Sequence, residues 1–164
     1  MTAPDPAASE SRLSDSTLSE STLSDSTLVT YYSRVDAGDL EAGLALLSSN
    51  VSFAILLPGS AVRGTDRDGV RRYLEERGPV DRRHVPTHAT RTGELEFVYG
   101  AVVEDGVTIT GHFLASARID DAGLITGYQV AFDPELGLAS PTLASTDPPS
   151  PTLAPTDPAS PTHD

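Results

Sequence analysis

The sequence lacks cysteine, lysine and tryptophan, and it has only four phenylalanines and five tyrosines. The absence of cysteine excludes disulfides, thiolate metal ligands and a cysteine nucleophile. No stretch approaches the roughly 18 apolar residues that span a bilayer. Residues 1–10 have neither the basic start nor the apolar centre of a secretory signal. We therefore expect a cytoplasmic protein that does not insert into a membrane.

Positive charge is scarce as well. All 11 basic residues are arginines, they face 24 acidic residues, and the formal net charge is −13. This balance favours solubility and disfavours nucleic acid and anionic membranes as partners. A local exception is the group of arginines between Arg67 and Arg83. It is interpreted as a solvated helix face paired with Glu75 and Glu76, or alternatively as a contact for an anionic ligand or partner.

Both ends of the chain are repetitive. Residues 14–28 repeat a five-residue unit of serine, threonine, leucine and acid, which gives neither a helix nor a strand a steady apolar face. Residues 140–164 repeat a proline-containing ten-residue unit, typical of extended, solvated chain. That segment is read as a linker, a ligand for a proline-binding module or a neutral expansion. We predict disordered tails over 1–26 and 137–164 around one domain over 27–136.

Apolar spacing and capping residues mark three helices in this domain. Leucine, tyrosine and valine recur at helical spacing over residues 28–35, and Ala37-Gly38 ends that helix. A second helix is predicted to begin after Asp39 and to end at Asn50. A third follows the capping segment that starts at Thr65 and stops before Gly78-Pro79.

Strand patterns fill the rest of the domain. The alternation of apolar and polar residues, with turn residues between the runs, predicts strands over 51–57, 83–91, 95–103, 107–119 and 124–133. Helices followed by a run of strands indicate an α+β fold, with three N-terminal helices packed on a bent antiparallel sheet.

This order of elements, with the segments TYYSRVDAGDLEAGLALLSSNVSFAILLPG and DAGLI, resembles the nuclear transport factor 2-like (NTF2-like) superfamily. The resemblance covers residues 27–136. Within the superfamily, the sequence looks closest to the SnoaL-like and ketosteroid isomerase-like branches. It implies a cone-shaped fold around an apolar pocket. It also implies that Tyr31 is a catalytic hydrogen-bond donor. The two carboxylates of the isomerases fall on Ile55 and Ala115, which cannot carry a proton.

Strand alternation indicates which side chains face the cone. In the long strand, Val107, Ile109, Gly111, Phe113, Ala115, Ala117 and Ile119 share one apolar face. The small residues Gly100, Gly111 and Ala115 are expected to leave room for a cavity. Taken with the other strands and the third helix, this predicts a ligand-binding set around Tyr31 made of Phe53, Ile55, Tyr73, Phe113, Ala115, Tyr128, Val130 and Phe132. The alternative is that these side chains simply fill the core.

The histidines do not suggest a metal site. His84 and His88 are predicted on one side of a single strand, about 13 Å apart at 3.3 Å per residue, too far to share one ion. His112 is predicted on the face away from the cone. His84 is read either as an acid or base at the pocket mouth or as a surface or packing residue. No metal or other cofactor is expected.

Two functions follow from these patterns. The first is a domain that binds a small hydrophobic molecule, with isomerisation, cyclisation or dehydration of a carbonyl compound as the reaction if there is one. The second is a non-catalytic association domain. It would form a homodimer through the outer sheet face, where residues 95–103 place Leu95, Phe97, Tyr99, Ala101 and Val103.

Overall fold

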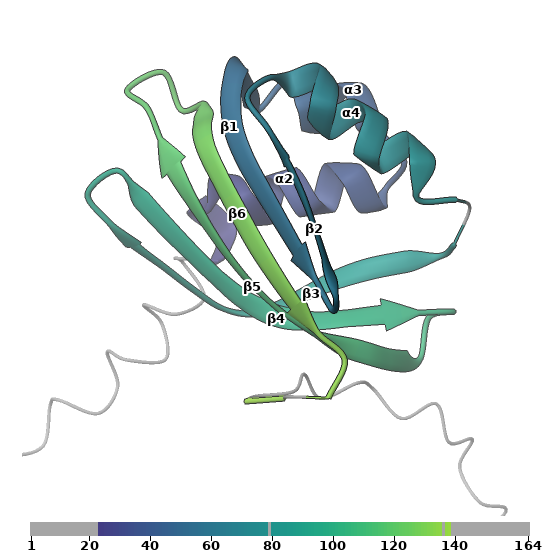
Figure 1. Ribbon diagram of the computed structural model, residues 1–164. Coiled ribbons are helices and arrows are strands. Elements are labelled where there is room, and N and C mark those ends of the chain that lie inside the picture. Colours follow the sequence, from purple (N-terminus) through teal and green to yellow (C-terminus); the bar gives the residue numbers. More distant parts are fainter. Residues whose placement is uncertain (1–22, 79, 136, 139–164) are drawn as a thin grey trace, which may run out of the picture.

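The described part of the chain forms one bent sheet with helices against its concave side (Figure 1). The computed structural model describes residues 23–78, 80–135 and 137–138. Most of the two predicted tails therefore lies outside the described residues. In chain order the elements are α2 (Thr27–Asp36), α3 (Leu40–Leu44), β1 (Leu47–Leu57), β2 (Ser60–Gly64), α4 (Arg67–Glu76), β3 (Arg82–Thr92), β4 (Leu95–Glu104), β5 (Thr108–Ile119) and β6 (Ile125–Asp133).

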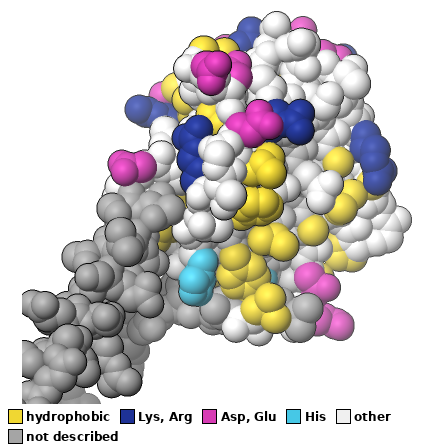
Figure 2. Space-filling view, turned by 90° about the vertical axis from the view of Figure 1, so that its left-hand side faces the viewer, with side chains coloured by type: hydrophobic (Ala, Val, Ile, Leu, Met, Phe, Trp, Pro, Cys, Tyr) yellow, Lys and Arg dark blue, Asp and Glu magenta, His cyan; other side chains and the backbone are white. Residues whose placement is uncertain are grey.

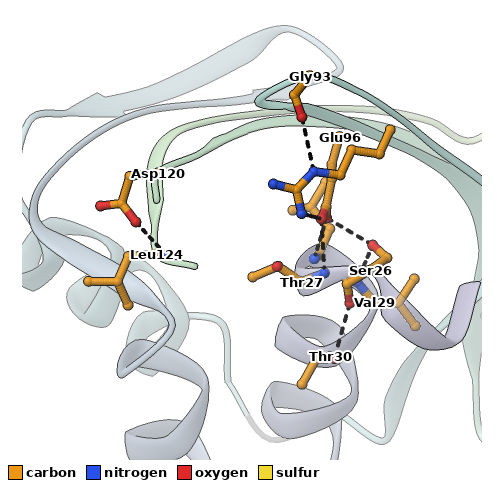
Figure 3. A network of polar contacts seen from close by, with 10 residues as sticks. Ser26, Thr27, Val29, Thr30, Gly93, Glu96, Asp120 and Leu124 are labelled. Carbon is orange, nitrogen blue, oxygen red and sulfur yellow. Dashed lines mark hydrogen bonds and ion pairs between the residues drawn. The ribbon is translucent and has the colours of Figure 1, made fainter. Parts of the chain in front are cut away.

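Helix α2 forms as the sequence predicts and is fixed at its first turn. Ser26 caps it, because its hydroxyl accepts a hydrogen bond from the Val29 amide. The buried carboxylate of Glu96 on β4 accepts hydrogen bonds from the Ser26 hydroxyl and from the Thr27 and Leu28 amides, at 3.0, 3.2 and 3.0 Å (Figure 3). A negative group thus satisfies helix amides that would otherwise lack acceptors.

The sheet confirms the α+β class and corrects one feature of it. The strand order is β2-β1-β6-β5-β4-β3. Most neighbours are antiparallel, but β1 and β6 run parallel, with Ile55 opposite Val130. The predicted antiparallel sheet is therefore corrected at this one pair, which makes the sheet mixed.

The boundary between the second helix and the first strand also differs from the prediction. Helix α3 ends at Leu44, and Leu47 already belongs to β1. The cause is the distant strand β6: Leu47 pairs with Ile125, and the Leu46 carbonyl accepts a hydrogen bond from the Ile125 amide. Pro58-Gly59 does not end the strand region but turns the chain into β2, which the sequence analysis missed.

A bulge in β5 changes which side chains face the concave side. Val102 pairs with Gly111 and Val103 with Ile109, so Thr110 is an extra residue that the ladder does not accommodate. Beyond the bulge the predicted alternation holds, and the side chains from Phe113 onward on that face are buried. Before the bulge it fails, because Val107 is 69% exposed and belongs to the turn region instead of the interior.

A second bulge, in β3, separates the two histidines. Pro86 pairs with Gly100 and His88 with Tyr99, which leaves Thr87 as the extra residue. His84 consequently packs against Tyr32 of helix α2, whereas His88 lies near Tyr99 on the opposite face. The prediction that both histidines share one side of the strand is wrong for this reason.

Candidate functional site

A cavity of about 480 Å³ lies between helices α2 and α4 and the concave face of the sheet. Its walls are mainly apolar and aromatic, with a few polar groups that converge on the same space. This is the usual composition of a site for a small organic molecule.

Most of the predicted ligand-binding residues line this cavity. Those that do are Tyr31, Ile55, Tyr73, Phe113, Tyr128, Val130 and Phe132. Two do not. Ala115 is fully buried in the core, and the Phe53 ring lies against Gly64 and Gly69, outside the cavity lining.

The glycines that were expected to leave room for the cavity have another role. A Cβ on Gly100 would collide with the Val85 carbonyl oxygen, and one on Gly111 would collide with the Phe132 ring. Both glycines lie at the bulges and allow close approach of the neighbouring strand. These glycines therefore serve the packing of the strands, and neither of them lines the cavity.

Three of the four tyrosines that line the cavity contact one another. The Tyr32 and Tyr128 hydroxyls are hydrogen-bonded to each other at 2.8 Å, and the Tyr31 ring contacts both of the other rings edge-on. The Tyr31 hydroxyl makes no hydrogen bond with any described residue. Among the described residues, every fully buried polar side-chain atom has a hydrogen-bond partner. The unpartnered Tyr31 hydroxyl is therefore not fully buried, and we infer that it is open to the cavity that Tyr31 lines.

Burial keeps these tyrosines protonated. Desolvation raises the pKa of Tyr31, Tyr32 and Tyr128 well above the ordinary value of 10.0. For Tyr31 the neighbouring Tyr128 raises the pKa further. Each hydroxyl is therefore neutral at physiological pH, and that of Tyr31 is available to donate a hydrogen bond to a ligand.

The remaining polar group of chemical interest is a histidine held by an aspartate. His84 lines the cavity, and its Nδ1 lies 2.9 Å from Oδ1 of Asp36 at the end of α2. The His84 backbone amide donates to Oδ2 of the same carboxylate at 2.6 Å. Both side chains are almost buried, at 10% and 12% exposure. The ring is also stacked on Tyr32, with centroids 4.3 Å apart.

This arrangement fixes the protonation pattern of the neutral imidazole. A carboxylate accepts, so the nitrogen facing Asp36 carries the proton. The lone pair is then on Nε2, on the other side of the ring from Asp36. Nε2 makes no hydrogen bond with any described residue. The geometry matches the requirement for a general base, which is a proton acceptor oriented by a second group.

Sequence reasoning identified His84 only as one of two alternatives and missed Asp36. One signal was available: Tyr32 and Asp36 are four residues apart on a helix and therefore share a face. Thr110 was missed because no local sequence pattern indicates the bulge that brings it to the cavity. The cavity lining also contains Arg77 and Arg82, which belong to the group of arginines noted in the sequence, and Glu104, which the sequence analysis did not select.

Comparisons with known proteins identify the fold. Neither a protein-family model nor a curated protein matches the sequence. Among solved structures, IdmH from Streptomyces antibioticus, a proposed polyketide cyclase, is 21% identical, with a TM-score of 0.51 over 65% of this chain and 89% of that one. A proposed ketosteroid isomerase from Kribbella flavida is 19% identical, with a TM-score of 0.52 over 86% and 93%. An NTF2-like protein of unknown function from Burkholderia pseudomallei is 20% identical, with a TM-score of 0.53 over 65% and 88%.

Proposed function

On the NTF2-like fold that these structures share, we propose that this chain binds a small apolar carbonyl compound and that His84 moves a proton on it. The observation that carries the proposal is the Asp36–His84 pair at an apolar cavity that also receives the Tyr31 hydroxyl. The structural neighbours include a proposed polyketide cyclase and a proposed ketosteroid isomerase, which supports chemistry of this class.

The residues suggest how the reaction proceeds. Nε2 of His84 accepts a proton from the carbon next to the carbonyl group, and Asp36 stabilises the imidazolium that forms. The electron pair moves to the carbonyl oxygen, which accepts a hydrogen bond from the Tyr31 hydroxyl. Return of the proton to another carbon completes an isomerisation, and loss of a neighbouring hydroxyl as water completes a dehydration.

This scheme replaces the carboxylates that the superfamily resemblance implies. Their positions fall on Ile55, which lines the cavity, and on Ala115, which is buried. The proposed base lies instead on β3, with its orienting carboxylate on α2. Apolar residues at the usual positions are therefore compatible with proton transfer from a different wall of the cavity.

Proton exchange on a simple ketone tests the proposal without knowledge of the natural substrate. In deuterated buffer, the wild-type protein should accelerate exchange of the α-protons of α-tetralone, followed by NMR. His84→Gln should reduce the protein-dependent rate by about 100-fold or more, because general base catalysis is worth that much. His88→Gln is the matched control and should leave the rate unchanged, since His88 lies on the other face. Equal rates for wild type and His84→Gln would refute the proposal.

A second candidate function, association into a homodimer, is favoured by one observation. Leu95, Phe97 and Leu114 are exposed on the sheet face that carries no helix, and Figure 2 shows hydrophobic side chains gathered in a band. The other predicted members contribute less. Ala101 and Val103 are buried within the chain, and the Tyr99 hydroxyl accepts a hydrogen bond from the Leu138 amide.

Light scattering at micromolar concentration tests this candidate. We expect about twice the 17.2 kDa mass of one chain, and the mass of one chain for a Phe97→Ser, Leu114→Ser variant. Burial of these side chains against a second copy removes apolar area from water. Val107→Ser, at an exposed turn position, should remain dimeric. A wild-type mass of one chain would exclude the dimer.

A further inference from the structure

The cavity differs in charge from the rest of the molecule. The chain carries a net charge of −13. The charged residues that line the cavity are two arginines and one glutamate, Arg77, Arg82 and Glu104. The Asp36 carboxylate that holds His84 adds one negative charge, which also acts on the Tyr31 hydroxyl. These four charges sum to zero, whereas the chain as a whole is strongly acidic.

Only one of the two arginines is neutralised. The Nε and Nη2 atoms of Arg82 both lie 2.8 Å from Oε1 of Glu104, its partner across the β3–β4 pair. Arg77, the residue that follows helix α4, forms no ion pair or hydrogen bond with any described residue. Its guanidinium instead lies 5.7 Å from the centre of the Tyr73 ring. Both Arg77 and Tyr73 line the cavity.

The charge of Arg77 acts on the interior of the cavity. Burial raises the pKa of Tyr31, Tyr32 and Tyr128, and the positive charge of Arg77 opposes this rise at each of the three hydroxyls. Arg77 is also half-buried. A partly desolvated cation without an anionic partner interacts strongly with an anion that enters the same space.

We propose that the molecule bound in this cavity is an organic acid, with an apolar body in the cavity and an oxyanion, such as a carboxylate or sulfonate, on the Arg77 guanidinium. This inference rests on the proposed ligand-binding function and adds the chemical class of the ligand. A guanidinium suits the role because its parallel N–H groups match the two oxygens of such a group. Arg82 cannot serve equally, because Glu104 neutralises its charge and already binds its Nε and Nη2 atoms.

A pair of fluorescent probes with the same ring system tests the inference. The anionic probe is 8-anilinonaphthalene-1-sulfonate, and the neutral probe is N-phenyl-1-naphthylamine, which lacks the sulfonate. We expect the wild-type protein to bind the anionic probe about tenfold more tightly than the neutral probe. A charge-assisted hydrogen bond contributes enough binding free energy for a difference of this size. Arg77→Gln should abolish this preference and leave binding of the neutral probe unchanged. Arg72→Gln, on the exposed face of α4, is the matched control and should keep the preference.

The outcomes separate this inference from the function on which it rests. All titrations use the Phe97→Ser, Leu114→Ser variant as the background. This prevents either probe from binding to the exposed apolar residues of the outer sheet face. If the neutral probe binds and the anionic probe binds no more tightly, or if Arg77→Gln retains the preference, the organic acid is refuted and the ligand site stands. If neither probe binds, the cavity is not a site for apolar ligands, and both proposals fail.

Discussion

Replacing Asp36 with asparagine is expected to lower the protein-dependent exchange rate of α-tetralone by about 10²–10⁴-fold while the fold is retained. The His84 backbone amide can only donate, so it keeps the amide oxygen of the new side chain as its acceptor. The NH₂ group then faces Nδ1, which must give up its proton in order to accept. The proton moves to Nε2, and the lone pair on Nε2 is lost.

Three measurements distinguish this explanation from simple loss of structure. Nitrogen-15 NMR of the imidazole should show the neutral tautomer change from Nδ1–H to Nε2–H in the variant. Binding of the neutral naphthylamine probe and the urea midpoint should stay close to wild type. Asp39→Asn, at the exposed cap of α3, is the control that should retain full activity. Retained exchange in Asp36→Asn, with the tautomer changed, would show that His84 is not the base.

Replacing Glu96 with alanine is expected to destabilise the protein by about 3 kcal/mol or more, measured by urea denaturation. Glu96 is 1% exposed. Its carboxylate accepts from two backbone amides and one hydroxyl at the start of α2. Removal would leave these donors buried and unpaired, and it would also open a cavity. Glu96→Gln should be destabilising too, since its NH₂ group would face N–H donors.

The control for Glu96 is its ion-pair partner. Arg91 is 47% exposed and lies 3.5 Å from Oε1 of Glu96, so Arg91→Ala should cost less than about 1 kcal/mol. A large effect of Arg91→Ala with a small effect of Glu96→Ala would show that the ion pair, and not the helix contact, is what stabilises this region. Because α2 carries Tyr31, Tyr32 and Asp36, we also expect Glu96 variants to lose exchange activity.

Features with a local cause were predictable from the sequence. Capping and apolar spacing located α2 and α4 closely, and turn residues located β3 to β6 within about one residue. Features that depend on a distant partner were not. Leu46 and Leu47 continue a helical pattern, but pairing with Ile125 recruits Leu47 into a strand. The bulge at Thr110 likewise depends on how β4 and β5 align, and alternation alone predicts no such slip.

The same distinction applies to the site. The apolar wall at Ile55, Phe113 and Val130 follows from strand alternation, and the structure places all three at the cavity. Strand alternation does not predict the proposed base. His84 is a candidate base because of its contact with the Asp36 carboxylate, which is 48 positions away in the chain. A second bulge decides that His84, and not His88, faces the concave side. Pairing across such distances leaves little trace in one sequence.

The parallel pairing of β1 and β6 has a consequence for how the chain is made. Ile55 meets Val130, 75 positions later, and β6 fills the gap between β1 and β5. Until a ribosome releases β6, no ladder among the described strands joins the β1–β2 hairpin to the β3–β4–β5 meander. Contacts between such distant positions slow the search for the native state. We therefore infer that closure of the sheet, and with it assembly of the cavity walls, is a late event that follows synthesis of β6.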